Sequence, residues 1–106
     1  MTDILKSLEQ TIGERRSADP GASYVASLRS KGRAKMAEKL GEEAIETVIA
    51  AVQDDKAAMT GEAADLLFHL MVLLADMDLS LDDVVAELAR REGLSGLDEK
   101  AARGAS

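Results

Sequence analysis

Residues 39–69 combine two segments of helical periodicity with two pairs of carboxylates, and this combination restricts the fold more than any other feature of the chain. At about 3.6 residues per turn, side chains three positions apart lie on one face of a helix. The acidic pairs with this spacing are Glu43 with Glu46 and Glu62 with Asp65. A short polar stretch joins the two predicted helices, 33–53 and 56–77, which makes them antiparallel neighbours. We therefore expect the two pairs to face each other.

Four carboxylates that converge between helices repel one another, because like charges away from bulk water cannot all stay ionised without a partner. A hard divalent cation relieves this repulsion, and Mg²⁺ takes oxygen ligands and commonly bridges to substrate phosphates. The chain has no cysteine and a single histidine, His69, so a softer metal would find few ligands. The four acidic residues therefore predict a site for Mg²⁺, with Mn²⁺ as the alternative ion.

A solvated helix face paired with lysines would also explain the acidic motif on the first helix. The residues concerned are Glu42, Glu43 and Glu46, with Lys35 and Lys39 at spacings of about one turn. The second pair favours the metal site, because Glu62 and Asp65 lie on a predicted helix with little other polar surface.

The composition favours an all-α fold. The 106 residues contain one proline and long runs rich in Ala, Leu and Glu, and the only aromatic residues are Tyr24 and Phe68. This length suits one domain with a single core. We expect a helical bundle of about four to five helices over residues 1–93, completed by dimerisation. Residues 94–106 are expected to form a mobile or loosely docked tail.

Several features indicate the compartment. The absence of cysteine excludes a disulfide scaffold and suits a reducing cytoplasm. The first residues lack the basic and then apolar pattern of a signal peptide, and the longest strongly apolar stretch, 66–75, is too short to span a bilayer. The formal net charge of −7 disfavours non-specific binding to nucleic acid. We expect a cytoplasmic protein that binds neither membrane nor nucleic acid.

The predicted helix over 33–53 has two apolar sectors. Met36, Leu40, Ala44, Thr47 and Ala51 form the first, and Ile45, Val48, Ile49 and Val52 form the second. A helix with one buried face needs only one such sector. Packing on two sides, inside the protomer and across a dimer interface, explains the pattern, so we expect a homodimer.

A basic run adjoins the acidic motif. Within eleven residues it carries five cations, opposed there only by Glu38, and they are Arg29, Lys31, Arg33, Lys35 and Lys39. Surface solubility would explain such a run, but beside a metal site it is a credible phosphate clamp. The residues expected to contact phosphates are Arg33, Lys35 and Lys39.

Other chemistries lack their motifs in this sequence. There is no cysteine nucleophile, no serine in an elbow sequence and no P-loop. A di-iron bundle would need Glu-x-x-His pairs, whereas Leu66 stands three residues before His69. His69 is instead expected to be a core or rim histidine satisfied by a carboxylate, and from there to orient a metal ligand, because it lies two turns from Glu62.

The acidic pattern, E-E-x-x-E followed by E-x-x-D on the next helix, resembles the MazG-like all-α nucleoside triphosphate pyrophosphatases. Within that superfamily the chain is most similar to the phosphoribosyl-ATP pyrophosphatase family. The matching stretches are SY at 23–24, GRAK at 32–35, KLGEEAIE at 39–46 and EAADLLFH at 62–69. The similarity covers most of residues 4–93. Phe68 departs from the family pattern, in which Tyr is more frequent, and so keeps the ring and loses a hydroxyl.

The resemblance implies hydrolysis of 1-(5-phosphoribosyl)-ATP to 1-(5-phosphoribosyl)-AMP and pyrophosphate, the second step of histidine biosynthesis, by Mg²⁺-assisted attack of water. It also implies a dimer with the site among its helices. The implied metal ligands are Glu43, Glu46, Glu62 and Asp65. Glu42 and Glu43 are the implied catalytic residues, with Glu42 as the first candidate to deprotonate the attacking water.

Two other functions remain open from the sequence. The chain also fits a MazG-like house-cleaning enzyme that acts on noncanonical nucleotides or dUTP, because the carboxylate signature specifies only the superfamily. It also fits a helical dimerisation module without catalysis, because the two-sided apolar helix suits that role equally well.

Overall fold

The computed structural model describes residues 2–92, and over that range the chain folds into five helices without a strand. They are α1 (Thr2–Arg15), α2 (Tyr24–Lys31), α3 (Arg33–Val52), α4 (Lys56–Asp76) and α5 (Leu81–Arg91). The predicted all-α fold is confirmed, and α3 and α4 begin and end within one residue of the predicted helices 33–53 and 56–77. The predicted tail, 94–106, lies outside the described residues.

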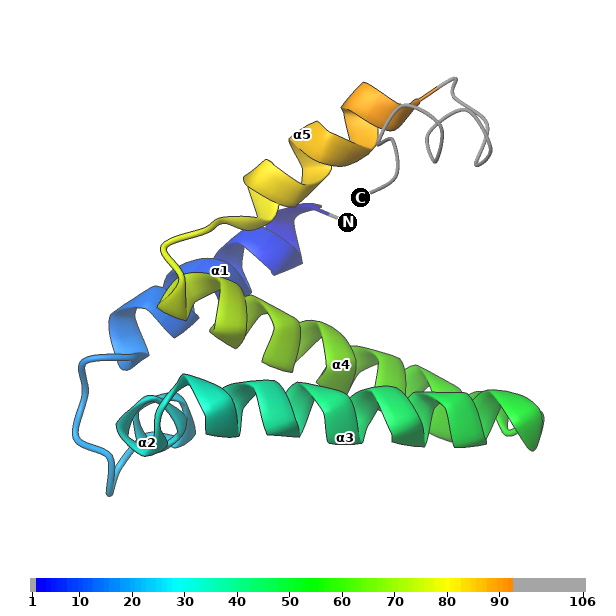
Figure 1. Ribbon diagram of the computed structural model, residues 1–106, viewed down its shortest axis with the longest axis horizontal. Coiled ribbons are helices and arrows are strands. Elements are labelled where there is room, and N and C mark those ends of the chain that lie inside the picture. Colours follow the sequence, from blue (N-terminus) through cyan, green and yellow to red (C-terminus); the bar gives the residue numbers. More distant parts are fainter. Residues whose placement is uncertain (1, 93–106) are drawn as a thin grey trace, which may run out of the picture.

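Helices α3 and α4 form a long antiparallel hairpin, as the short polar connection predicted (Figure 1). The turn between them contains Asp54, whose φ of 53° lies in the left-handed region that Asp tolerates better than most residues. Asp55 then caps α4, because its carboxylate accepts a hydrogen bond from the amide of Ala58 at 3.0 Å. The turn therefore fixes the relative register of the two acidic helices.

The buried core lies at the other end of this hairpin, where α1 and α2 pack against α3 and α4. Its residues are Ile12, Val25, Leu28, Met36, Met71 and Val72. Helix α2 crosses the hairpin at this end, whereas α1 and α5 extend away from it (Figure 1). The hairpin is thus anchored at the end distant from its turn.

Polar contacts connect α1 and the residue that follows it to the end of α4 and the start of α5. Arg16 donates to the backbone carbonyl of Ala75, and the amide of Leu81 donates to the Glu9 carboxylate at 2.6 Å. Ser80 caps α5 in a capping box with Asp83, each side chain accepting from the other residue's backbone amide. These contacts set the direction in which the chain leaves α4.

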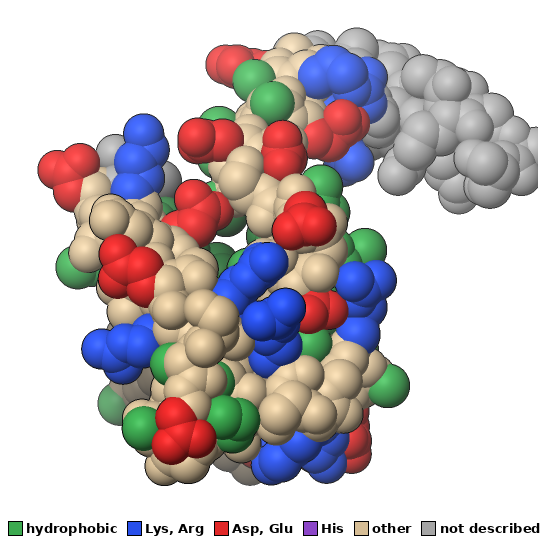
Figure 2. Space-filling model, turned by 90° about the vertical axis from the view of Figure 1, so that its left-hand side faces the viewer, with side chains coloured by type: hydrophobic (Ala, Val, Ile, Leu, Met, Phe, Trp, Pro, Cys, Tyr) green, Lys and Arg blue, Asp and Glu red, His purple; other side chains and the backbone are tan. Residues whose placement is uncertain are grey.

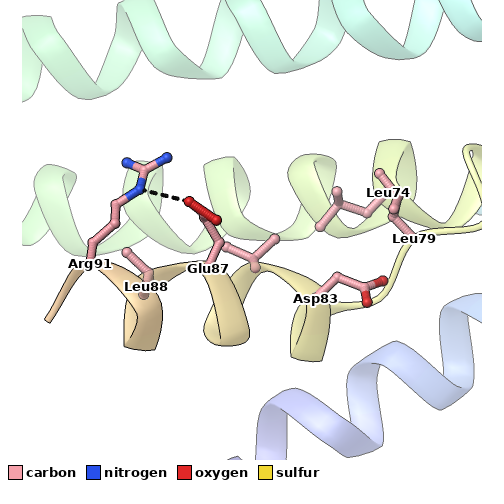
Figure 3. A pocket seen from close by; sticks show the side chains of 7 residues that line it. Leu74, Leu79, Asp83, Glu87, Leu88 and Arg91 are labelled. Carbon is pink, nitrogen blue, oxygen red and sulfur yellow. Dashed lines mark hydrogen bonds and ion pairs between the residues drawn. The ribbon is translucent and has the colours of Figure 1, made fainter. Parts of the chain in front are cut away.

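An open groove of about 330 Å³ lies between α5 and the last part of α4 (Figure 3). Leu74, Leu79 and Leu88 supply apolar side chains to it, and Glu87 is paired with Arg91 at 3.2 Å along the helix. No residue of α5 is buried. Within residues 2–92, therefore, α5 is the helix least integrated into the core.

Much apolar surface of the hairpin is uncovered. The second apolar sector of α3 faces solvent, with exposures of 63% for Ile45, 60% for Val48 and 82% for Val52. Helix α4 is long and apolar enough to cross a bilayer by composition alone, but the core helix of a soluble protein meets the same criterion. Only 17% of its most apolar window is buried. A helix of this composition is usually central, so both helices present surface for a further partner.

The small core gives a first prediction. Leu28 is 1% exposed, so Leu28→Ala should leave a cavity and lower the free energy of unfolding by roughly 2–5 kcal/mol. Ile4, which is 75% exposed on α1, is the matched control, and Ile4→Ala should change it by less than about 0.5 kcal/mol. Urea unfolding followed by circular dichroism measures both. Equal effects of the two substitutions would contradict this assignment of the core.

Candidate metal centre

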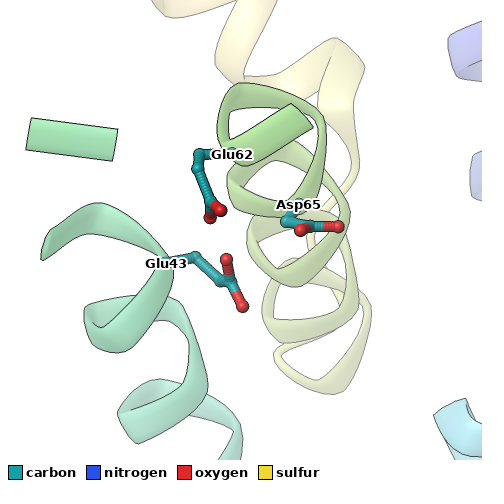
Figure 4. A group of neighbouring side chains, drawn as sticks. All are labelled: Glu43, Glu62 and Asp65. Carbon is teal, nitrogen blue, oxygen red and sulfur yellow. The ribbon is translucent and has the colours of Figure 1, made fainter. Parts of the chain in front are cut away.

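Three carboxylates meet across the contact between α3 and α4. Glu43 projects from α3 toward Glu62 on α4, and Asp65 lies one turn further along α4 with its carboxylate turned to the side (Figure 4). One oxygen of each lies within 4.8 Å of the others. The helical spacing therefore brings together three of the four carboxylates that the sequence predicted as metal ligands.

The two glutamates at the centre are short of hydrogen-bond partners. Glu43 Oε2 and Glu62 Oε2 are both buried, and neither accepts a hydrogen bond. A buried carboxylate oxygen without a donor is costly, because it has lost its water and gained nothing in exchange. Each of these oxygens therefore points to a missing positive partner.

Crowding also changes the acidity of Glu62. The nearby carboxylate of Glu46, the partial loss of water and the nearby carboxylate of Glu43 together raise the pKa of Glu62 from 4.5 to about 7. One proton is thus retained near neutral pH in place of a cation. The effect of Glu46 on Glu62 also shows that Glu46, the fourth predicted ligand, lies next to the centre.

Glu46 and Glu62 border an open hollow of about 190 Å³ that lies between the acidic centre and the turn of the hairpin. Ile49, Ala50 and Ala58 provide its apolar wall, and Gln53 lies at its end. The centre is therefore accessible to solutes from the side where the carboxylates of Glu46 and Glu62 lie.

The donor set suits a hard cation. All the available ligand atoms are carboxylate oxygens, as Mg²⁺, Mn²⁺ and Ca²⁺ prefer, and within residues 2–92 no histidine joins the group. The orphaned oxygens of Glu43 and Glu62 would both gain a partner from such an ion. The residues present fit a divalent metal ion.

The basic run is distributed along α3 and only its end reaches the centre. Lys39 lies about one turn from Glu43 and pairs with Glu42 at 3.3 Å, whereas Lys35 pairs with Glu38 at 3.0 Å. Hydrogen bonding to Glu42 raises the pKa of Lys39, so this lysine stays charged. Lys39 is therefore the predicted phosphate ligand best placed to act beside the carboxylates.

Arg33 lies at the opposite end of α3 from the turn. Ten residues separate it from Glu43, which corresponds to about 15 Å along a helix. Its guanidinium holds the carboxylate of Asp76 at 2.8 Å and the backbone carbonyl of the same residue at 3.1 Å. In this structure Arg33 therefore links the start of α3 to the end of α4.

Lysine and arginine side chains gather at that end of the molecule, interleaved with acidic ones (Figure 2). Arg16 and Arg29 line an open hollow there, and each donates to a backbone carbonyl. The basic surface is thus largely occupied with joining α1, α2 and α4.

His69 has different partners from the expected carboxylate. Its Nδ1 lies 2.8 Å from the backbone carbonyl of Asp65, and its Nε2 lies 3.0 Å from the hydroxyl of Tyr24. A carbonyl can only accept, so Nδ1 carries the hydrogen and, in the neutral ring, Nε2 accepts from Tyr24. His69 is buried and touches the main chain of a predicted ligand, which agrees with an orienting role. Tyr24 was not among the predicted site residues, although it lies in one of the stretches that resemble the family and is one of only two aromatic residues.

Known proteins resemble the chain over nearly its whole length. The family model described as phosphoribosyl-ATP pyrophosphohydrolase matches residues 5–92. A phosphoribosyl-ATP pyrophosphatase of Rhizorhabdus wittichii is 65% identical, over 97% of this chain and 97% of its own length. Proteins of the same name from Erythrobacter litoralis and Novosphingobium aromaticivorans are 64% and 61% identical, over 96% and 95% of this chain and 98% and 94% of their own lengths. The matched region contains the whole acidic centre.

The raised pKa of Glu62 gives a prediction for the metal-free protein. A carboxyl whose pKa rises on folding stabilises the fold below its unfolded value of about 4.5, and this contribution is lost as the pH rises through about 7. The side chain of Glu62→Gln cannot lose a proton. In EDTA, the melting temperature of this variant should therefore rise relative to that of the wild type as the pH increases from 5 to 8.

The control for this comparison is Glu38→Gln, which removes a carboxylate paired with Lys35 outside the centre. It should follow the wild-type pH dependence. Thermal unfolding monitored by circular dichroism across the pH range measures all three proteins. Parallel curves for wild type and Glu62→Gln would show that the carboxylates do not crowd one another as described.

Proposed function

The chain belongs to the phosphoribosyl-ATP pyrophosphohydrolase family, and from this we propose that it hydrolyses 1-(5-phosphoribosyl)-ATP to 1-(5-phosphoribosyl)-AMP and pyrophosphate, the second step of histidine biosynthesis. The observation that carries the proposal is the acidic centre of Glu43, Glu62 and Asp65 inside the matched region. Carboxylates alone would repel a triphosphate, so the centre suits this substrate only with a cation. A soluble biosynthetic enzyme of this kind would act in the cytoplasm.

We propose Mg²⁺ as that cation, held by Glu43, Glu46, Glu62 and Asp65, with Mn²⁺ as an alternative. When bound, Mg²⁺ supplies positive charge that binds the phosphate oxygens and stabilises the leaving pyrophosphate. The support comes from the all-oxygen donor set and the two orphaned glutamate oxygens. His69 would hold the backbone of Asp65 in place while this residue binds the ion.

Lys39 and Glu42 would work together in the reaction. In the free protein the two side chains satisfy each other at 3.3 Å. A phosphate that draws the ammonium of Lys39 away would leave the Glu42 carboxylate free to accept a proton from the attacking water. Lys35 lies about one turn earlier on α3 and would contact phosphate further from the metal. Arg33, which is held by Asp76, remains a predicted phosphate ligand without support from its position.

The test is pyrophosphate release from phosphoribosyl-ATP with and without Mg²⁺, beside the same assay on ATP and dUTP. Release that needs the metal and is confined to phosphoribosyl-ATP is the expected result. Asp65→Asn should lower kcat at saturating Mg²⁺ by at least about a hundredfold, because it weakens charge stabilisation at the reacting phosphate. Glu38→Gln is the control and should keep wild-type turnover.

Other outcomes would lead to other conclusions. Comparable release from ATP or dUTP would assign the protein to a house-cleaning role within the same superfamily. No release from any nucleotide, together with no stabilisation by Mg²⁺, would favour a non-catalytic dimerisation module. Near-normal turnover by Asp65→Asn would show that the metal ion binds at a different place.

We also propose that the protein is a homodimer, with a second copy covering the outward sector of α3. Ile45, Val48, Ile49 and Val52 form this sector, and all of them are at least 49% exposed. Such a contiguous apolar face is rare on a monomer. An identical helix offers the same face around a two-fold axis, so a second copy is complementary in chemistry without further adaptation.

Val48 lies in this sector and is 60% exposed, so Val48→Glu should place charges against each other in the dimer and shift the protein to monomer. Ile4→Glu puts the same charge on an exposed position of α1 and should leave the assembly unchanged. Size-exclusion chromatography with light scattering measures the mass of each. A dimeric Val48→Glu protein would place the interface on another face.

A further inference from the structure

All the aromatic side chains of this protein lie together beside the metal centre. The chain has one tyrosine, one phenylalanine and no tryptophan. The rings of Tyr24 and Phe68 are stacked with centroids 6.1 Å apart and an angle of 22° between their planes. The ring of His69 meets both of them edge-on, at 5.9 Å from Tyr24 and 5.2 Å from Phe68. Such pairs hold one another in defined orientations.

Tyr24 is held firmly although it is half exposed. Its hydroxyl is hydrogen-bonded to the buried His69, and its backbone opens α2 directly after the buried N-cap Ser23. The ring is stacked with that of Phe68, and 52% of the residue stays accessible to solvent. A large flat apolar group is thus presented to solvent in a fixed orientation.

Tyr24 is connected to both helices that carry the charged residues of the site. Through His69, the hydroxyl of Tyr24 is connected to the main chain of Asp65 by two hydrogen bonds, of 3.0 and 2.8 Å. Helix α2, which begins at Tyr24, packs against α3, the helix that carries Lys39. A ligand with phosphates at Lys39 and at the carboxylates would therefore have the Tyr24 ring next to its adjoining group.

We propose that the exposed face of Tyr24 is the stacking platform for the adenine of the substrate. This inference rests on the proposed function, because the adenine of phosphoribosyl-ATP is separated from the triphosphate by a single ribose. Stacking of a base on an aromatic side chain contributes about 1–3 kcal/mol to binding. An adenine substituted at N1 also carries a positive charge at neutral pH, and cations are attracted to the face of a tyrosine ring. Tyr24 therefore favours the N1-substituted nucleotide over ATP.

The first test separates the ring from its hydroxyl. Tyr24→Leu removes the aromatic face and should raise KM for phosphoribosyl-ATP by roughly tenfold or more, with kcat reduced by much less, because the ring binds the base and not the reacting phosphate. Tyr24→Phe keeps the face and should stay within about threefold of the wild-type KM. Ile4→Ala, at an exposed apolar position of α1, is the control for general loss of surface.

A second measurement detects stacking without turnover. Tyr24 is the only tyrosine, so its ring protons give a single set of NMR signals that Tyr24→Phe removes. These signals should shift upfield when the reaction product phosphoribosyl-AMP is added, because an adenine over the ring shields them. Inorganic pyrophosphate has no base and should leave them in place. AMP should cause the same shift at higher concentration.

The outcomes distinguish this inference from the proposed function. Wild-type hydrolysis of phosphoribosyl-ATP with an unchanged KM in Tyr24→Leu would overturn the platform and leave the function standing. Equal defects in Tyr24→Leu and Tyr24→Phe would assign the effect to the hydroxyl bond with His69. Tyrosine signals that do not shift at saturating product would also overturn the stacking platform. Absence of hydrolysis by the wild type would remove the proposed function itself, and with it the premise.

Discussion

The repulsion between carboxylates across the α3–α4 contact is the constraint on which the structure depends. Glu43 and Glu62 lie where two long helices would ordinarily bury apolar side chains, and an oxygen of each is buried without a donor. In the metal-free protein, a proton kept on Glu62 near neutral pH reduces the repulsion between the carboxylates. A divalent cation would satisfy the same oxygens and release that proton. Ion binding and folding of the hairpin are therefore linked.

The position of the core follows from this constraint. Apolar packing is concentrated where α1 and α2 meet the hairpin, around Leu28 and Met36, and the carboxylates lie further toward the turn. The core can therefore hold the two helices together at one end while the charged middle stays open to solutes. The outward sector of α3 is largely exposed within one chain. A second copy on that face would supply the apolar contact that the middle of the hairpin lacks.

Periodicity and capping predicted the parts of this structure that depend on neighbours in sequence. Spacing along a helix fixed which face the acidic pairs share, and the short turn with Asp55 as a cap made the helices antiparallel. Contacts between distant segments were not predictable in this way. The bond from Arg33 to Asp76 and that from Tyr24 to His69 depend on how α2 and the end of α4 pack against α3. The sequence therefore predicted that Glu43, Glu62 and Asp65 are neighbours, as the structure has them, but it gave no role to Tyr24.

The fixed and open parts of the site have different physical tasks. His69 is buried and bonded on both ring nitrogens, so it can hold the Asp65 backbone and the Tyr24 hydroxyl in one arrangement before any ligand arrives. Lys39 and Glu42 are partly exposed and satisfied only by each other, so their contact can be exchanged for one to a phosphate at little cost, since exposed ion pairs are weak. The preorganised part of the site thus lies where we propose that the metal ion and the adenine bind. The adaptable charges lie where we propose that the triphosphate enters and pyrophosphate leaves.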